Sequence, residues 1–150
     1  MSELKDEVPG LNFDSEINKL ICNILLTNNW LEEKLKSFFA GFGVTYQQYN
    51  VLKILAQDAT KPLNPAQIKL MMVDKNPDVT RLCDRLEAKG MIVRKTNAMN
   101  KRQILVSLSV EGLKIYTDMR PKVNAYTLSL PACSPMECKA ISDGIDKVRG

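Results

Sequence analysis

The residues of this chain that could do chemistry are arginines and lysines, and the densest group of them lies in one segment. Residues 75–102 contain eight Lys or Arg and three Asp or Glu, a net charge of +5, whereas the whole chain of 150 residues carries only +4. Cationic side chains neutralise phosphates, and arginine also donates hydrogen bonds to base edges. The concentration of charge therefore predicts an element that binds nucleic acid.

The first half of this segment predicts a short helix over about 77–89 that ends at Gly90. At 100° per residue its apolar side chains share one side, which holds Val79, Leu82, Cys83 and Leu86. The opposite side holds Pro77, Arg81, Asp84 and Ala88, with Thr80 and Arg85 on the flanks. An outer side with little bulk and a long arginine suits a helix that enters the major groove. The alternative is that these arginines are solvated charges and that Asp84 pairs with Arg81.

The second half predicts a β-hairpin with strands at about 91–95 and 103–108, joined by residues 96–100. Ile104, Val106 and Leu108 alternate with other residues and predict a half-buried face. The charged residues of the hairpin are all basic: Arg94, Lys95, Lys101 and Arg102. A hairpin that is merely solvated would more often mix signs, so the hairpin favours the nucleic-acid interpretation over the alternative.

The elements that must position this segment can be read from caps and periodicity. Residues 1–13 predict a loose arm, and Asp14 is expected to cap a helix over about 14–40. That helix would be ~40 Å long, more than a small domain needs. Further helices are expected at about 45–56, 65–73, 109–129 and 134–149. Ser109 is expected to cap the third of these, and Ser134 with Glu137 to form a capping box at the start of the last. Asn64-Pro65 and Asn76-Pro77 are each expected to begin a helix, and Pro121 to kink or break one.

The chain lacks the residues that several classes of function require. The chain has no histidine, no CxxC pair, no Gly-rich phosphate loop and no GxSxG motif. We therefore expect no enzyme, no metal site and no cofactor. No apolar run reaches the ~18 residues of a membrane helix, and residues 1–10 do not resemble a secretory signal. The four cysteines fit reduced thiols, so we expect a cytoplasmic protein that does not bind membranes.

One run of the sequence resembles the recognition helix and wing of the MarR (multiple antibiotic resistance regulator) family: DVTRLCDRLEAKGMIVRKTNAMNKRQILVSLSVEG. The matching parts are Thr80-Arg81-Leu82, Asp84-Arg85-Leu86-Glu87, Lys89-Gly90, Arg94 and the wing Asn100-Lys101-Arg102. The upstream run VTYQQYNVLKILA resembles the second helix of that family. The order of elements agrees over about residues 14–149.

The resemblance implies a mainly α fold with a small β-hairpin wing: a winged helix-turn-helix with N- and C-terminal dimerisation helices. The single domain 1–150 would have a DNA-binding lobe at about 45–108 and dimerisation helices at about 14–40 and 110–149. A homodimeric, cytoplasmic transcription regulator would follow, with recognition helices in successive major grooves of a pseudo-palindromic operator. The implied DNA contacts are Asn76, Pro77, Asp78, Thr80, Arg81, Asp84, Arg85, Arg94, Asn100, Lys101 and Arg102. Arg102 matches the arginine that enters the minor groove, and Asn100 replaces the aspartate that usually supports it.

The resemblance also implies a ligand-responsive repressor with a small-molecule effector between the dimerisation helices and the DNA-binding lobe. Trp30, Phe38, Phe42, Tyr46 and Tyr49 are candidates to line that site, although aromatic residues at helical spacing are also ordinary core. Two alternatives stay open. One is a winged-helix module that binds proteins and not DNA. The other is a thiol-based redox sensor using Cys22, but Leu26, Lys36 and Gln47 stand where such sensors carry supporting tyrosines.

Overall fold

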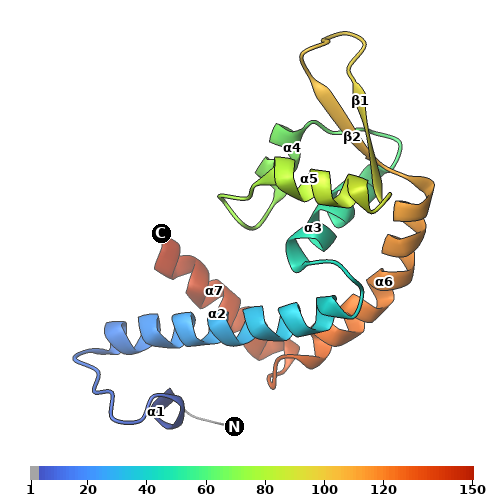
Figure 1. Cartoon of the computed structure of the whole chain (residues 1–150). Helices are drawn as coiled ribbons and strands as arrows, with labels where there is room; N and C mark the ends of the chain where they lie inside the picture. Colours follow the sequence, from blue (N-terminus) through green and yellow to red (C-terminus); the bar gives the residue numbers. More distant parts are fainter. Residues whose placement is uncertain (1–3) are drawn as a thin grey trace. The chain divides into compact units, whose positions relative to one another are not determined.

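The computed structural model describes residues 4–150, which form two compact units. The first unit ends at Gln47, and the second comprises Gln48–Gly150. Figure 1 shows a long N-terminal helix, a group of shorter helices beside a two-stranded hairpin, and two further helices toward the C-terminus. Across the described residues, no helix combines the length and the apolar character needed to cross a membrane.

The first unit consists of α1 (Leu4–Glu7) and α2 (Glu16–Ala40). The prediction of a loose arm over residues 1–13 is wrong for Leu4–Glu7, which form a helical turn in which Leu4 is buried, and it is confirmed for residues 8–13, which belong to neither helix nor strand. Residues 1–3 of that arm lie outside the described part. The predicted cap at Asp14 is also wrong: Ser15 directly precedes the first helical residue, and its hydroxyl accepts the N–H of Asn18.

The second unit contains most of α3 (Tyr46–Leu55), the 3₁₀ turn η1 (Ala56–Asp58) and α4 (Pro65–Met71). The predicted cap of α4 is confirmed. The Asn64 side chain accepts the N–H of Gln67 at 2.9 Å, and the Gln67 side chain accepts the N–H of Asn64 at 2.9 Å. With Pro65 in the first turn, this capping box fixes where the first helix of the helix-turn-helix begins.

The helix α5 (Val79–Ala88) follows, and then the antiparallel strands β1 (Ile92–Thr96) and β2 (Ile104–Leu108). Their register pairs Ile92 with Leu108 and Thr96 with Ile104. Leu63, in the segment before α4, also pairs with Val106 through N–H···O distances of 2.9 and 2.8 Å. This additional pairing was not predicted, and it attaches β2 to the start of the helix-turn-helix.

The core of this unit lies between α3, α4, α5 and the hairpin. Its fully buried side chains include Leu52, Leu55, Ile68, Met72, Leu86, Ile92 and Val106. The predicted half-buried face of β2 is confirmed at Val106, whereas Ile104 is exposed because it lies near the tip of the hairpin. β2 is thus buried at its middle residue and exposed at the end near the tip, and the hairpin projects from the unit (Figure 1).

The chain ends with α6 (Val110–Ser129) and α7 (Pro135–Arg149). Ser109 caps α6, as predicted, and α7 begins with the predicted capping box of Ser134 and Glu137. Of the kink or break expected at Pro121, the break does not occur, because α6 continues through this residue. A proline removes one backbone hydrogen bond, and the helix retains the remaining bonds on both sides.

Candidate nucleic-acid interface

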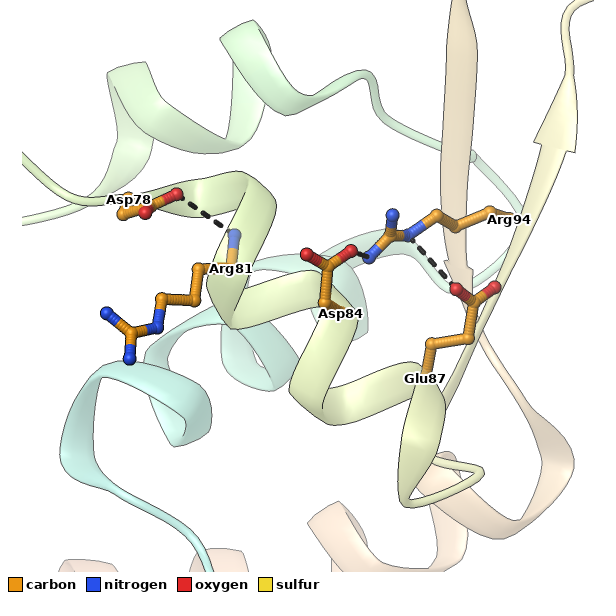
Figure 2. Close-up of polar contacts among 5 residues, drawn as sticks. All are labelled: Asp78, Arg81, Asp84, Glu87 and Arg94. Carbon is orange, nitrogen blue, oxygen red and sulfur yellow. Dashed lines mark hydrogen bonds and ion pairs between the residues drawn. The ribbon is translucent and has the colours of Figure 1, made fainter.

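The two ends of α5 are fixed by its own sequence. Asp78 caps the N-terminus, where its carboxylate accepts the N–H of Arg81 at 3.0 Å (Figure 2). The predicted cap at Asn76 is therefore wrong, because the helix starts two residues later and the N–H of Asn76 instead donates to Asp74 at 2.9 Å. A carboxylate cap satisfies a free N–H and complements the positive end of the helix.

Gly90 ends α5 with a positive φ of 69°. The N–H of Gly90 donates to Glu87 O at 2.8 Å, and the N–H of Met91 donates to Leu86 O at 2.9 Å. These two bonds form a Schellman motif, in which glycine adopts the left-handed conformation without a steric penalty. The chain therefore leaves α5 in a defined direction and enters β1 two residues later.

The predicted division of α5 into two faces is confirmed. Val79, Cys83 and Leu86 are buried, and Leu82 is partly buried. The opposite face exposes the predicted contact residues Thr80, Arg81, Asp84 and Arg85. This face carries two acidic groups, Asp84 and Glu87, which would repel the phosphates of a nucleic acid if they were uncompensated.

Arg94 of β1 compensates both acidic groups, as Figure 2 shows. Its Nη2 donates to Asp84 Oδ1 at 2.6 Å, and its Nε lies 3.4 Å from Glu87 Oε2. Partial burial alone would lower the pKa of Arg94, but the hydrogen bond to Asp84 and the charges of Glu87 and Asp84 outweigh it and raise that pKa. Arg94 was predicted from sequence as a DNA contact, and the structure also gives it an intramolecular role that joins the hairpin to the helix.

The two arginines of α5, Arg81 and Arg85, are available to bind another molecule. The alternative interpretation paired Asp84 with Arg81, and this is wrong: Asp84 is held by Arg94, and the Arg81 side chain points away from it (Figure 2). Among the described residues, neither Arg81 nor Arg85 forms an ion pair. The exposed face of α5 is thus cationic at Arg81 and Arg85, while Asp84 and Glu87 share the single positive charge of Arg94.

The connection between the strands of the wing is ordered by its own amides. The Asn97 amide donates to Gln103 Oε1 at 2.6 Å, and its Oδ1 accepts the N–H of Met99 at 3.0 Å. Asn100 Oδ1 accepts the N–H of Arg102 at 3.2 Å. These bonds give the tip a defined shape, and they leave the side chains of Lys101 and Arg102 exposed.

The base of the wing is fixed against the start of α6. The Ser109 hydroxyl donates to Gly90 O at 2.6 Å and accepts the N–H of Gly112 at 2.8 Å. Gly112 approaches Met91 so closely that an added Cβ would lie 1.8 Å from the Met91 carbonyl oxygen. Ser109 was predicted only as a helix cap, and the structure shows that it also holds the turn between α5 and β1.

Apart from Arg94 on β1, the predicted contact residues fall into two groups. Thr80, Arg81, Asp84 and Arg85 lie on one exposed face of α5, and Asn76, Pro77 and Asp78 lie at or just before its N-terminus. Asn100, Lys101 and Arg102 lie at the tip of the wing. Glu87, which forms the second ion pair of Arg94, was not predicted as a functional residue from the sequence. Its spacing of one helical turn from Asp84 was nevertheless visible there.

The candidate effector residues are distributed over both units. In the first unit, Phe38 and Tyr46 belong to an aromatic cluster, with ring centroids 5.3 Å apart for Phe38–Phe39 and 5.6 Å apart for Phe39–Tyr46. In the second unit, Tyr49 is buried and stacks on Tyr116 at 5.8 Å, a contact that was not predicted. Trp30 lies exposed on α2. Tyr49 is therefore a core residue of its own unit.

In the described part of the chain, the acidic and cysteine side chains do not form a cluster that could bind a metal ion. Among residues 4–150 there is no group of three or more Cys, Asp or Glu side chains that could hold a metal ion. Cys22 is half-buried on α2, and Cys83 is only 1% exposed. Burial raises the pKa of the Cys83 thiol, and the nearby charge of Arg94 only partly opposes this, so Cys83 is a poor nucleophile.

The short helices α4 and α5, the hairpin attached to them and the cationic exposed face together define a winged helix-turn-helix protein. Residues 44–104 match the family model described as the MarR family. The HTH-type transcriptional regulator PapX of Escherichia coli is 25% identical over 122 residues, which cover 81% of this chain and 73% of PapX. The resemblance inferred from sequence is therefore confirmed, with the match to the MarR family extending over residues 44–104.

Solved structures agree with this assignment over nearly the whole chain. A MarR-like transcription regulator from Bacillus cereus superposes with a TM-score of 0.77 at 17% identity, covering 89% of this chain and 96% of the other. A mutant MarR from E. coli, complexed with operator DNA, gives a TM-score of 0.70 at 26% identity, covering 92% of this chain and 99% of the other. These matches include the helices outside residues 44–104, so the mainly α winged-helix fold class is confirmed.

Proposed function

We propose that the chain is a homodimeric, sequence-specific regulator of transcription that binds double-stranded DNA, with α5 in the major groove and the wing in the minor groove. The observation that carries the proposal is the exposed face of α5, where Asp84 and Glu87 are both bound by Arg94, while Arg81 and Arg85 form no ion pair among the described residues. A face that presents two exposed arginines, with its carboxylates held by a third, fits a phosphate-lined groove. The related MarR that is complexed with operator DNA supports the same mode of binding.

Different parts of the interface would have different tasks. Arg81 and Thr80, near the N-terminus of α5, would face base edges, and Arg85 would face the backbone. Arg102 would enter the minor groove from the wing, with Lys101 against a phosphate. Asn100 holds the backbone of Arg102 as an aspartate would, but it brings no negative charge near the DNA.

Dimerisation is supported by apolar surface that the single chain leaves uncovered. On α2, the exposed apolar side chains include Ile17 at 70% and Leu25 at 59% exposure. On α7, which has no buried residue, Met136 is 80% exposed and Ile141 is 55% exposed. Exposed apolar residues repeated along two helices indicate a protein partner. A second copy would place two α5 helices for successive major grooves.

Regulation would follow the family pattern inferred from the sequence. We place the protein in the cytoplasm as a repressor released by a small-molecule effector. The aromatic cluster of the first unit, which includes Phe38, Phe42 and Tyr46, is the candidate to contact that effector. Trp30 is a second candidate because it is partly exposed.

The experiment is selection of bound sites from a random duplex pool, followed by affinity measurements at several salt concentrations. A pseudo-palindromic site whose half-sites lie about 10 base pairs apart would support two α5 helices in successive major grooves. A steep loss of affinity with salt would report the number of phosphates contacted. Arg81→Ala should weaken binding strongly, whereas Lys139→Ala, a matched loss of one positive charge on α7, should leave it nearly unchanged. If no duplex binds at low salt, the chain is not a DNA-binding regulator, and a winged-helix protein-binding module becomes the better explanation.

A further inference from the structure

The junction between α6 and α7 holds two cysteines in direct contact. The Sγ atoms of Cys133 and Cys138 are 2.8 Å apart, and both thiols are free. A disulfide bond measures about 2.05 Å, so the two sulfur atoms need to approach by less than about 1 Å to bond. The separation of five residues matches no familiar cysteine motif, which is why the sequence did not reveal the pair.

The local structure explains why these two side chains meet. Ser134 caps α7, and its side chain and that of Glu137 form a reciprocal capping box. Cys133 is the residue before the cap, and Cys138 is the fourth residue of the helix; side chains at these two positions pack together as a staple at helix N-termini. The N–H of Cys138 also donates to Ser134 O at 2.9 Å. The contact therefore depends on the first turn of α7 alone.

Both thiols are accessible enough to react, unlike the thiol of Cys83. Cys133 and Cys138 are half-buried, whereas Cys83 is 1% exposed. The hydrogen bond with Cys138, together with partial burial, raises the pKa of Cys133, which lowers the thiolate fraction of this sulfur. The contact between the two sulfur atoms, and not an acidic thiol, is therefore what supports disulfide formation. An aliphatic pair would staple the helix equally well, but it could not be oxidised.

We infer that Cys133 and Cys138 form a dithiol site that hydrogen peroxide converts reversibly into an intramolecular disulfide. One sulfur, as thiolate, attacks a peroxide oxygen and breaks the O–O bond, which gives a sulfenic acid and, after proton uptake, one water. The second sulfur then displaces the sulfenic oxygen as a second water and forms the S–S bond. The two sulfur atoms lose two electrons and hydrogen peroxide gains them. A dithiol reductant restores the thiols by exchange.

The disulfide would make the staple of α7 covalent. It would tie the segment before Ser134 to the first turn of the helix, where two weak hydrogen bonds from and between the thiols now hold Cys133. The closed loop is short, so the change in overall stability from chain entropy is small. The expected effect is local: the amide hydrogens of the first turn of α7 exchange more slowly after oxidation.

The site can be tested on the full chain with hydrogen peroxide, because trypsin places both thiols in one peptide. Cleavage after Lys122 and after Lys139 releases residues 123–139. After oxidation, alkylation in denaturant and digestion, this peptide should lack two hydrogens and take up no alkyl group. After reduction it should take up two alkyl groups. Cys22→Ser is the matched control and should show the same disulfide.

Single substitutions separate disulfide formation from general oxidation. Cys133→Ser and Cys138→Ser each leave one thiol without its partner, and each should accumulate a sulfenic acid that dimedone traps, which the unsubstituted chain should not. The circular dichroism of both variants checks that the helices have formed. The inference is overturned if the 123–139 peptide keeps both thiols at a peroxide dose that oxidises Cys22. It is equally overturned if Cys133 or Cys138 is found linked to a different cysteine.

Discussion

Replacing Arg94 by alanine removes the cation that joins β1 to α5. The Arg94 side chain is 23% exposed, but its partners Asp84 and Glu87 are 58% and 45% exposed. Solvent therefore screens both ion pairs, and each should contribute about 0.5–1 kcal/mol, well below the value for a fully buried pair. We expect Arg94→Ala to lower the free energy of unfolding by about 1–2 kcal/mol, which lowers Tm by roughly 2–8 °C in a chain of this size.

Urea unfolding of Arg94→Ala, Asp84→Asn and the double variant, at one fixed protein concentration, gives the coupling between the two side chains. We expect a coupling free energy of about 0.5–1 kcal/mol. Lys95→Ala is the matched control, because it removes one positive charge from the next residue of the same strand. That control should change the free energy of unfolding by less than about 0.5 kcal/mol.

The same variants test whether the ion pairs of Arg94 with Asp84 and Glu87 contribute to DNA binding. In Arg94→Ala, the carboxylates of Asp84 and Glu87 would face the phosphates without a counter-charge, so affinity for the selected duplex should fall. Adding Asp84→Asn should recover part of that affinity while the stability remains low. A coupling free energy of zero would show that the pair does not form in solution. Failure of Asp84→Asn to recover any affinity would refute neutralisation as the reason for the pair.

Three other predictions follow from the geometry. Gly112→Ala should lower the free energy of unfolding by about 1–3 kcal/mol because its Cβ would collide with the Met91 carbonyl; Gly144→Ala, with open space around its Cβ, should instead stabilise the chain by about 0.5–1 kcal/mol in the same urea titration. Arg102→Ala should weaken binding to the selected duplex by about 1–3 kcal/mol without changing Tm, and an unchanged affinity would mean that the wing does not enter the groove. Hydrogen bonds in the capping box lower the pKa of Glu137 below its ordinary 4.5, so its contribution to α7 is complete above that pH and is lost as the pH falls through the folded-state pKa. The helical circular dichroism of the native chain should therefore decrease more steeply than that of Glu137→Gln over this acidic range, and parallel curves would argue against the capping box.

Much of this architecture could be predicted because the signals are local. Caps such as Asn64 with Gln67, and Ser134 with Glu137, need only residues three positions apart, and the structure contains both. The buried and exposed faces of α5 follow from helical periodicity alone. The mistakes were local as well: Ser15 and Asp78 cap helices in place of Asp14 and Asn76, because several acceptable capping residues lie next to each other and the sequence does not show which one the chain uses.

Contacts between residues far apart in the chain could not be predicted from the sequence. Nothing in the pattern indicated that Leu63 pairs with Val106 or that Tyr49 stacks on Tyr116. The most consequential case is Arg94, which sequence reasoning counted with the cations available to DNA. Its ten-residue separation from Asp84 is bridged only because the Schellman turn at Gly90 directs β1 back along α5.

The sequence by itself thus determined the helices, the hairpin, the concentration of positive charge and the family, because these depend on residue type and short spacing. The tertiary structure decided which charges are free. It pairs Arg94 with Asp84 and Glu87, and it leaves Arg81 and Arg85 on an exposed face. The strength of an ion pair depends on distance and on exposure to solvent, and both quantities exist only after the hairpin has packed against the helix.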